Sequence, residues 1–90
     1  MDVSRHGVTQ VITVGVASVA VTNPFAATTT IVRLASTTGC YIEVGGTPVA
    51  SSADAYLPPN VIEYVLVAPG EKIAAIQASA GGFLTVTEVA

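Results

Sequence analysis

Apolar and polar side chains alternate along much of this chain, with the period of two that is typical of β-strands. The alternation is clearest where Cys40, Ile42 and Val44 are separated by Tyr41 and Glu43. This spacing predicts that Cys40 is buried, because it shares a strand face with two aliphatic residues, and that it is free, because it is the only cysteine. No segment shows the 3.6-residue period of an amphipathic helix, so the pattern predicts an all-β chain.

Turn-forming residues divide the chain into seven or eight short segments of strand length. Glycine or proline separates most of them, as at Thr22-Asn23-Pro24-Phe25 and at Gly81-Gly82. Short strands at this spacing are typical of a sandwich, and we predict a small antiparallel β-sandwich of the jelly-roll type. The expected strands cover residues 8–14, 16–21, 28–35, 40–44, 61–67, 72–78 and 83–89, with a short edge strand at 55–57.

The stretch from Tyr56 to Ala78 is the most strongly punctuated part of the sequence. Pro58-Pro59 lies outside any strand, because proline has no N–H to donate to a sheet. Pro69-Gly70 suits the centre of a type II turn, whose second central residue needs a positive φ that glycine adopts freely. Apolar runs at 61–67 and 72–78 flank this turn, and we expect them to pair with each other as a hairpin.

Both faces of the predicted strand 61–67 are apolar. Ile62, Tyr64 and Leu66 share one face, which is expected to fill the core. Glu63 marks the opposite face as the outer one, yet the valines beside it are too apolar to face water, so we expect another chain to cover them at least in part. The predicted interface comprises this face and part of a neighbouring loop, namely Val61, Glu63, Val65, Val67, Thr47, Pro48 and Val49.

Few charged residues are available to cover the surface of this 90-residue chain. They make up 10% of the sequence, while 51% of the residues are hydrophobic; an average soluble domain has roughly 25% charged residues. Threonines can cover some strand faces, but we expect the remaining apolar surface to be buried in a homo-oligomer or on a larger assembly. The length fits one domain, with an N-terminal arm at residues 1–7 and the sandwich at 8–90.

Charge and ligand chemistry argue against several classes of partner. The net charge is −3 and only three residues are basic, too few to neutralise phosphates, so we expect neither a nucleic-acid nor a membrane partner. Residues 7–32 carry no charge, but they contain too many polar and β-branched residues for a membrane-spanning helix. One histidine and one cysteine cannot form a structural zinc site within a chain, and we expect no metal or cofactor.

No set of acidic and basic side chains points to catalysis. His6 falls in the predicted arm, where nothing holds it within hydrogen-bond reach of a partner. The carboxylates are spread over the terminus, turns and strands, and Glu88 is expected on a solvated strand face. Gly45-Gly46 and Gly81-Gly82 precede no helix and lack the Lys-Ser/Thr of a phosphate-binding loop. We therefore predict that the chain is not an enzyme, and we assign no catalytic residue.

Two features leave a binding function open. The aromatic side chains could form a stacking platform for a sugar, or they could pack in the core and at interfaces. They are Phe25, Tyr41, Tyr56, Tyr64 and Phe83. The segment Gly45–Asp54 is the best candidate for a contact loop, because loops on a rigid scaffold often carry recognition residues.

The second half of the chain carries a series of short motifs in a defined order. They are Cys40-Tyr41-Ile42-Glu43-Val44-Gly45-Gly46-Thr47-Pro48-Val49-Ala50, Tyr56-Leu57-Pro58-Pro59-Asn60, Glu63-Tyr64, Pro69-Gly70-Glu71-Lys72-Ile73-Ala74 and Gly82-Phe83-Leu84-Thr85-Val86-Thr87-Glu88. The series, which lies between Thr30 and Val89, resembles a family of very small structural proteins encoded by tailed bacteriophages. The resemblance implies a β-sandwich located in the virion, and it brings no catalytic residues.

Two classes of function follow from this resemblance. The first is a non-enzymatic capsid cement or decoration protein, made in the host cytoplasm, which oligomerises on the outer capsid and stabilises contacts between capsomers. Its partners would be the major capsid protein and copies of itself. The alternative is a binding module, a small head-to-tail, tail or fibre component that recognises, for example, carbohydrate. Aromatic residues clustered on exposed loops would favour the binding module, whereas apolar faces with a bland loop surface would favour cement.

Overall fold

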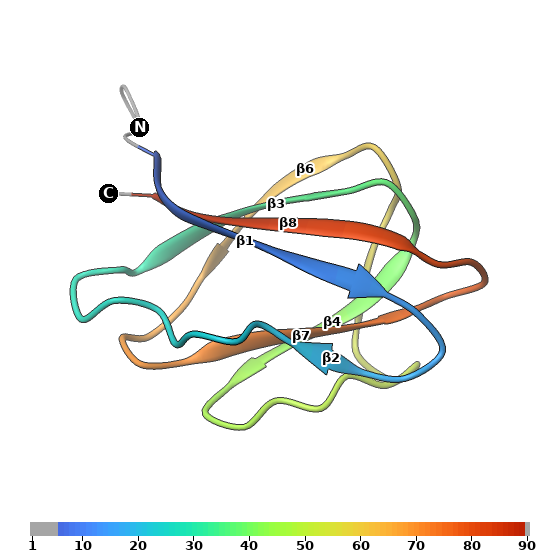
Figure 1. Ribbon diagram of the computed structural model, residues 1–90, viewed down its shortest axis with the longest axis horizontal. Coiled ribbons are helices and arrows are strands. Elements are labelled where there is room, and N and C mark those ends of the chain that lie inside the picture. Colours follow the sequence, from blue (N-terminus) through green and yellow to red (C-terminus); the bar gives the residue numbers. More distant parts are fainter. Residues whose placement is uncertain (1–5, 90) are drawn as a thin grey trace.

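The structure is a computed structural model that describes residues 6–89, and every regular element in that range is a β-strand (Figure 1). The eight strands are β1 (His6–Val14), β2 (Val19–Ala20), β3 (Ile31–Ser36), β4 (Cys40–Gly45), β5 (Ala55–Leu57), β6 (Ile62–Leu66), β7 (Lys72–Gln77) and β8 (Gly82–Val89). Each lies within a few residues of a strand expected from the sequence, and the short edge strand β5 has the predicted bounds. The all-β prediction is confirmed for the described residues.

The strands form two four-stranded antiparallel sheets packed face to face. Sheet A has the order β1-β8-β3-β6, and sheet B has the order β2-β7-β4-β5. Each strand of the first half pairs with a strand of the second half: β1 with β8, β2 with β7, β3 with β6 and β4 with β5. This is the pairing of a long antiparallel ribbon wrapped into two sheets, so the predicted jelly-roll sandwich is confirmed.

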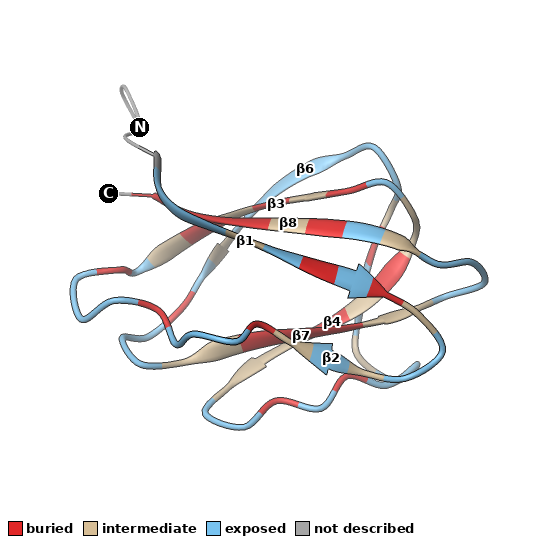
Figure 2. Cartoon of the chain, in the orientation of Figure 1, coloured by how far each residue is buried: buried red, intermediate tan, exposed pale blue. Residues whose placement is uncertain are grey.

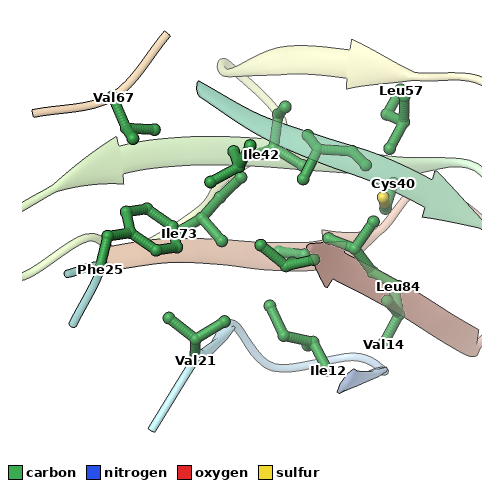
Figure 3. Close-up of a cluster of buried hydrophobic side chains, with 14 residues drawn as sticks. Ile12, Val14, Val21, Phe25, Cys40, Ile42, Leu57, Val67, Ile73 and Leu84 are labelled. Carbon is green, nitrogen blue, oxygen red and sulfur yellow. The ribbon is translucent and has the colours of Figure 1, made fainter. Parts of the chain in front are cut away.

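The core lies between the sheets and is built from the inward-facing residues of both (Figure 3). Ile12 and Leu84 come from sheet A, Ile73 and Cys40 come from sheet B, and Phe25 closes one end from the connection between β2 and β3. Cys40 is fully buried and free, as its alternation with aliphatic residues predicted. In a chain of this size the apolar contacts between the two sheets are the main source of stability.

The N-terminal boundary of the domain differs from the prediction. Strand β1 begins at His6, so residues 6–7 belong to sheet A and not to a separate arm. The register of β1 against β8 shifts between His6 and Thr9, which marks a β-bulge at the start of the strand. The rest of the predicted arm, residues 1–5, lies outside the described residues.

The predicted hairpin between residues 61–67 and 72–78 is wrong, although its turn is right. Glu71 N–H donates to the Ala68 carbonyl at 3.1 Å, and Gly70 has a φ of 81°, as a type II turn requires. However, β6 pairs with β3 in sheet A, whereas β7 pairs with β4 and β2 in sheet B. The turn therefore carries the chain from one sheet to the other. A tight turn redirects the chain, but it does not determine which strand becomes the hydrogen-bonded neighbour.

The two faces of β6 are the reverse of those predicted. Leu66 is 77% exposed, Ile62 and Tyr64 are also exposed, and Val67 is only 9% exposed. Val65 packs against the core. Figure 2 shows β6 as the most exposed strand of sheet A.

The reversal follows from the position of β6 at the edge of sheet A. Residues paired across neighbouring strands point to the same face, and Val65 and Glu63 are paired with the buried Val32 and Leu34 of β3. Glu63 thus lies on the inner face, but at an edge strand its carboxylate reaches water around the side of the sandwich, and the residue is exposed. A charged residue on an edge strand is therefore no marker of the outer face.

Adjacent lysine substitutions at the end of β6 test this assignment of faces. Val67→Lys places a charge against the core, which leaves an unpaired ammonium with little water, so we expect it to destabilise or unfold the domain. Leu66→Lys places the same charge in water, and we expect the free energy of unfolding to change by less than about 0.5 kcal/mol. Thermal unfolding of both variants beside wild type gives the comparison; a stable Val67→Lys with an unfolded Leu66→Lys would contradict the structure.

The burial of the Cys40 thiol leads to a second prediction, on how the stability of the domain changes at alkaline pH. Burial raises the pKa of Cys40 above its usual value of 9.0, and a hydrogen bond to Ser36 offsets only part of this rise. In the unfolded chain the thiol ionises first, so the stability associated with Cys40 is present below about pH 9 and is lost as the pH rises further. Denaturant titrations between pH 7 and 10.5 should show a steeper loss of stability for wild type than for Cys40→Ala. Parallel pH profiles would refute this.

Candidate interaction surface

The face of sheet A that points away from the core is not covered by any described part of the chain. We call it the outer face. Its side chains alternate with the core-facing residues of the same strands, which is why all four strands contribute to it, and Thr87 is its one buried member. It comprises Thr9, Val11 and Thr13 of β1, Phe83, Thr85 and Thr87 of β8, Ile31, Arg33 and Ala35 of β3, and Ile62, Tyr64 and Leu66 of β6.

The outer face exposes an unusual amount of apolar surface for so small a chain. Val11 is 62% exposed and Phe83 is 55% exposed, and the three apolar side chains of β6 are exposed to similar or greater extents. Tyr64 and Phe83, each about half exposed, together expose roughly 200 Å², taking ~150–250 Å² for a fully exposed aromatic side chain. The five side chains form two groups, Val11 and Phe83 toward the β1 edge and the three of β6 at the other edge, with threonines, Ala35 and Arg33 between them. Exposed apolar surface rimmed by polar residues often marks an interaction site.

The shape of the outer face follows from the strand register. One row across the sheet runs Val11, Thr85, Ala35, Ile62, so the two smaller residues lie in the middle and the larger ones at the margins. A shallow hollow of about 340 Å³ forms at this point, lined by Ala35, Thr85 and Ile62 together with Arg33, Ser36, Thr37, Asn60 and Val61. The outer face can therefore receive a projecting side chain of a partner.

Arg33 is the only charged residue of the outer face. It is partly exposed and lies between Thr87 of β8 and Tyr64 of β6 in the register of the sheet. The other polar residues of the face are threonines, whose hydroxyls tolerate either water or a protein partner. A partner surface that matches this face is apolar and offers an acceptor, such as a carboxylate, opposite the guanidinium.

The outward side of sheet B differs, because the chain's own loop covers it. The segment between β4 and β5 crosses the sheet and returns (Figure 1). Ala50 N–H donates to Ser18 Oγ at 2.8 Å, and Val49 N–H donates to the Glu43 carboxylate at 3.4 Å. Ala74 is paired with Glu43 on the outward side of the sheet, yet it is completely buried. The two outward sides of the sandwich are therefore not equivalent, and sheet A presents the open one.

The structure separates the residues of the predicted interface. Val67 belongs to the core, and the partly buried Val65 packs against it, so neither lies on the outer face. Val61 is exposed beside the hollow of the outer face, and Glu63 is exposed at its edge. The loop residues lie over sheet B, where Pro48 is buried and Thr47 and Val49 are exposed. A partner contact by the exposed residues of this set stays a prediction.

The sequence reasoning missed most of the outer face. It placed Ile62, Tyr64 and Leu66 in the core, and it gave no interface role to Val11 or Phe83. Alternation along β1 and β8 showed that these residues lie on a common face, but not that this face is open. The strand pairing of the folded chain was needed to decide this.

The aromatic residues do not form a single stacking platform. Phe25 is in the core, and Tyr64 and Phe83 lie on different strands of the outer face. Tyr41 and Tyr56 form a tilted pair on the opposite sheet, with ring centroids 5.6 Å apart. All except Phe25 are carried by strands and none of these four by a loop.

Among the described residues, Glu88 is the one buried carboxylate, which corrects the expectation of a solvated position. It accepts hydrogen bonds from the Ala26 N–H at 3.2 Å and from the Thr29 hydroxyl. These bonds tie the connection between β2 and β3 to the end of β8, which is a structural role. A hollow of about 360 Å³ lies beside this carboxylate, bordered by Gly7, Val8, Ala26, Thr28 and Thr29.

The described residues contain no group of three or more histidine, cysteine, aspartate or glutamate side chains placed to hold a metal ion. Among the same residues there is no helix with the length and hydrophobicity needed to span a membrane. No protein-family model matches the chain, and comparisons with curated proteins and with solved structures found no match. The function is therefore inferred from the surfaces of the fold.

The structural role of Glu88 can be tested by substitution. Glu88→Ala leaves the Ala26 N–H and the Thr29 hydroxyl without their acceptor, so we expect a loss of about 1–3 kcal/mol in the free energy of unfolding. Glu63→Ala is the matched control, because it removes an exposed carboxylate from the same sheet, and its effect should be within about 0.5 kcal/mol of wild type. Urea denaturation measures both; equal effects would show that the buried hydrogen bonds do not stabilise the fold.

Proposed function

We propose that this chain is a non-enzymatic structural protein of a bacteriophage virion, of the capsid cement or decoration type. It docks through the outer face of sheet A on the major capsid protein and associates with other copies of itself, and so stabilises contacts between capsomers at the capsid surface. The observation that carries the proposal is the open, apolar outer face with Arg33 as its single charge. The motif series of the second half of the chain supports the location in a phage particle.

The physical basis of docking is the burial of the outer face. A standard protein interface buries about 800 Å² on each partner, and the five large apolar side chains of the outer face supply part of that area. Each single contact can be weak, because many copies act together on a symmetric shell and their attachments reinforce one another.

The distribution of aromatic residues supports cement over a carbohydrate-binding module. A sugar site needs aromatic rings gathered at one exposed place, and here the exposed rings are divided between two sheets. The loop between β4 and β5 is hydrogen-bonded to its own sheet, and Val49 is its only exposed large apolar side chain. Tail, fibre or head-to-tail placement remains the second candidate, favoured by the Tyr41–Tyr56 pair alone.

Purified phage particles provide the test of location. Mass spectrometry should find peptides of this chain in a fixed high-copy ratio to those of the major capsid protein. A ratio of a few copies per particle would favour the second candidate, and absence from particles would contradict both.

Lysine substitutions test the docking surface on particles that lack this chain. Leu66→Lys adds a charge at the end of the apolar margin that β6 forms, and we expect it to fold and to reduce the number of bound copies by at least about tenfold, since desolvating an unpaired charge costs more than ~1.4 kcal/mol. Val49→Lys tests the loop over sheet B at a valine of similar exposure, 69% against 77% for Leu66, and docking through sheet A predicts that it binds like wild type. Loss of binding by Val49→Lys with normal binding by Leu66→Lys would place docking on the loop.

A further inference from the structure

Three of the four sheet edges are protected against pairing with another chain, and the fourth is not. The edge strands β2 and β5 of sheet B have only two and three residues. Strand β6 has five residues, lies between Pro59 and Pro69, and carries the exposed carboxylate of Glu63 on its inner face. Short strands, nearby prolines and inward-pointing charges are the usual protections of sheet edges.

Strand β1 is the exception, at the other edge of sheet A. It has nine residues, and no charged residue or proline occurs from Gly7 to Val14. Its only irregularity is the bulge before Thr9, so the stretch from Thr9 to Val14 is a regular strand. The Gln10 side chain exchanges two hydrogen bonds with the backbone of Asn23, so the connection after β2 lies beside β1 on its inner side, while Thr9, Val11 and Thr13 stay exposed.

The hydrogen bonds around β8 show which peptide groups of β1 are free. Thr37 N–H donates to the Phe83 carbonyl, so the backbone groups of Phe83 point toward β3. Because these directions alternate along an antiparallel strand, the N–H and C=O groups of Leu84 and Val86 point toward β1. There the two residues pair with Ile12 and Gln10. The N–H and C=O groups of the residues between and beside them, Thr9, Val11 and Thr13, therefore point away from the sheet.

We infer that β1 pairs with β1 of a second copy of this chain, antiparallel about a two-fold axis at Val11. In this register Val11 faces its own symmetry mate, and Thr9 faces Thr13 of the second copy. All three are residues with free backbone groups, and each pair exchanges two hydrogen bonds, as a regular antiparallel ladder requires. No other symmetric register pairs these three residues only with one another.

The side chains of β1 suit self-pairing. A two-fold interface brings each residue against the same surface of its mate, so a charged strand would repel itself, and Thr9–Val14 is uncharged. The facing Val11 side chains and the Thr9–Thr13 pairs are β-branched, which favours packing between neighbouring strands. This self-compatibility is why a second copy, and not another protein, is assigned to the edge.

Pairing through β1 joins two four-stranded sheets into one of eight strands. A two-fold axis perpendicular to the sheet keeps both outer faces on the same side, with Val11 and Phe83 of each copy near the centre. The inference rests on the proposed function, which includes association between copies of the chain. Pairing through β1 also doubles the apolar surface available for docking.

Cysteine cross-linking tests the register directly. Val11→Cys places two thiols opposite each other, with Cα atoms about 5.5 Å apart, within the range of a disulfide. We expect mild oxidation to convert most of this variant to a covalent dimer, while Thr9→Cys forms one only when mixed with Thr13→Cys. Native Cys40 is buried and does not interfere. Tyr64→Cys, on the opposite edge, should stay monomeric under the same oxidation; dimers of Tyr64→Cys without dimers of Val11→Cys would overturn the proposal.

Analytical ultracentrifugation separates edge pairing from docking by the outer face. Val11→Pro removes an outward N–H and should weaken the dimer by roughly tenfold or more, whereas Val11→Thr keeps the N–H and should leave it intact. Leu66→Lys should dimerise normally while failing to dock on particles, so the two proposals fail independently. A wild-type chain that stays monomeric, or a dimer lost in Leu66→Lys and kept in Val11→Pro, would overturn pairing through β1.

Discussion

The structure depends on pairing between strands that are far apart in the chain. β1 lies against β8 and β3 lies between β8 and β6, so sheet A assembles only when both ends and the middle of the sequence meet. Such contacts carry a large loop-closure entropy, which the burial of the shared core must offset. The same pairing fixes the direction of every side chain in the sheet, because paired residues share a face. The strand register therefore determines both which residues form the core and which residues form the outer face.

The surfaces of the sandwich differ because the chain covers only one of them. The loop after β4 lies over sheet B and is held there by Ser18 and Glu43, which buries Ala74. Nothing described covers sheet A, whose outer face carries exposed apolar side chains at both margins, among them Val11 and Leu66. A small protein with one closed and one open side is suited to attachment by the open side. This asymmetry, together with the phage-like motifs, is the basis of the proposed role in a capsid.

The edges of the sheets add a second distinction. Edge strands expose unpaired backbone groups, and most edges here are short or carry a charge or nearby prolines. β1 is long, uncharged and regular beyond its bulge. Docking through a face and pairing through an edge use different groups, side chains in one case and peptide groups in the other. A decoration protein that used both would attach to its shell and to its neighbour at once, without a conflict between the two contacts.

The sequence by itself determined the elements of this protein. Alternation placed Cys40 in the core, glycine and proline marked the turns, and Gly70 took the positive φ that its turn requires, because these are local properties of a few residues. Only the tertiary structure decided the partners and the faces. Pro69-Gly70 joins two sheets and not two paired strands, and Leu66 faces water while Val67 is buried. The position of Glu63 at an edge made the inner face look like the outer one, and the alternation of apolar and polar residues does not distinguish an edge strand from a central one.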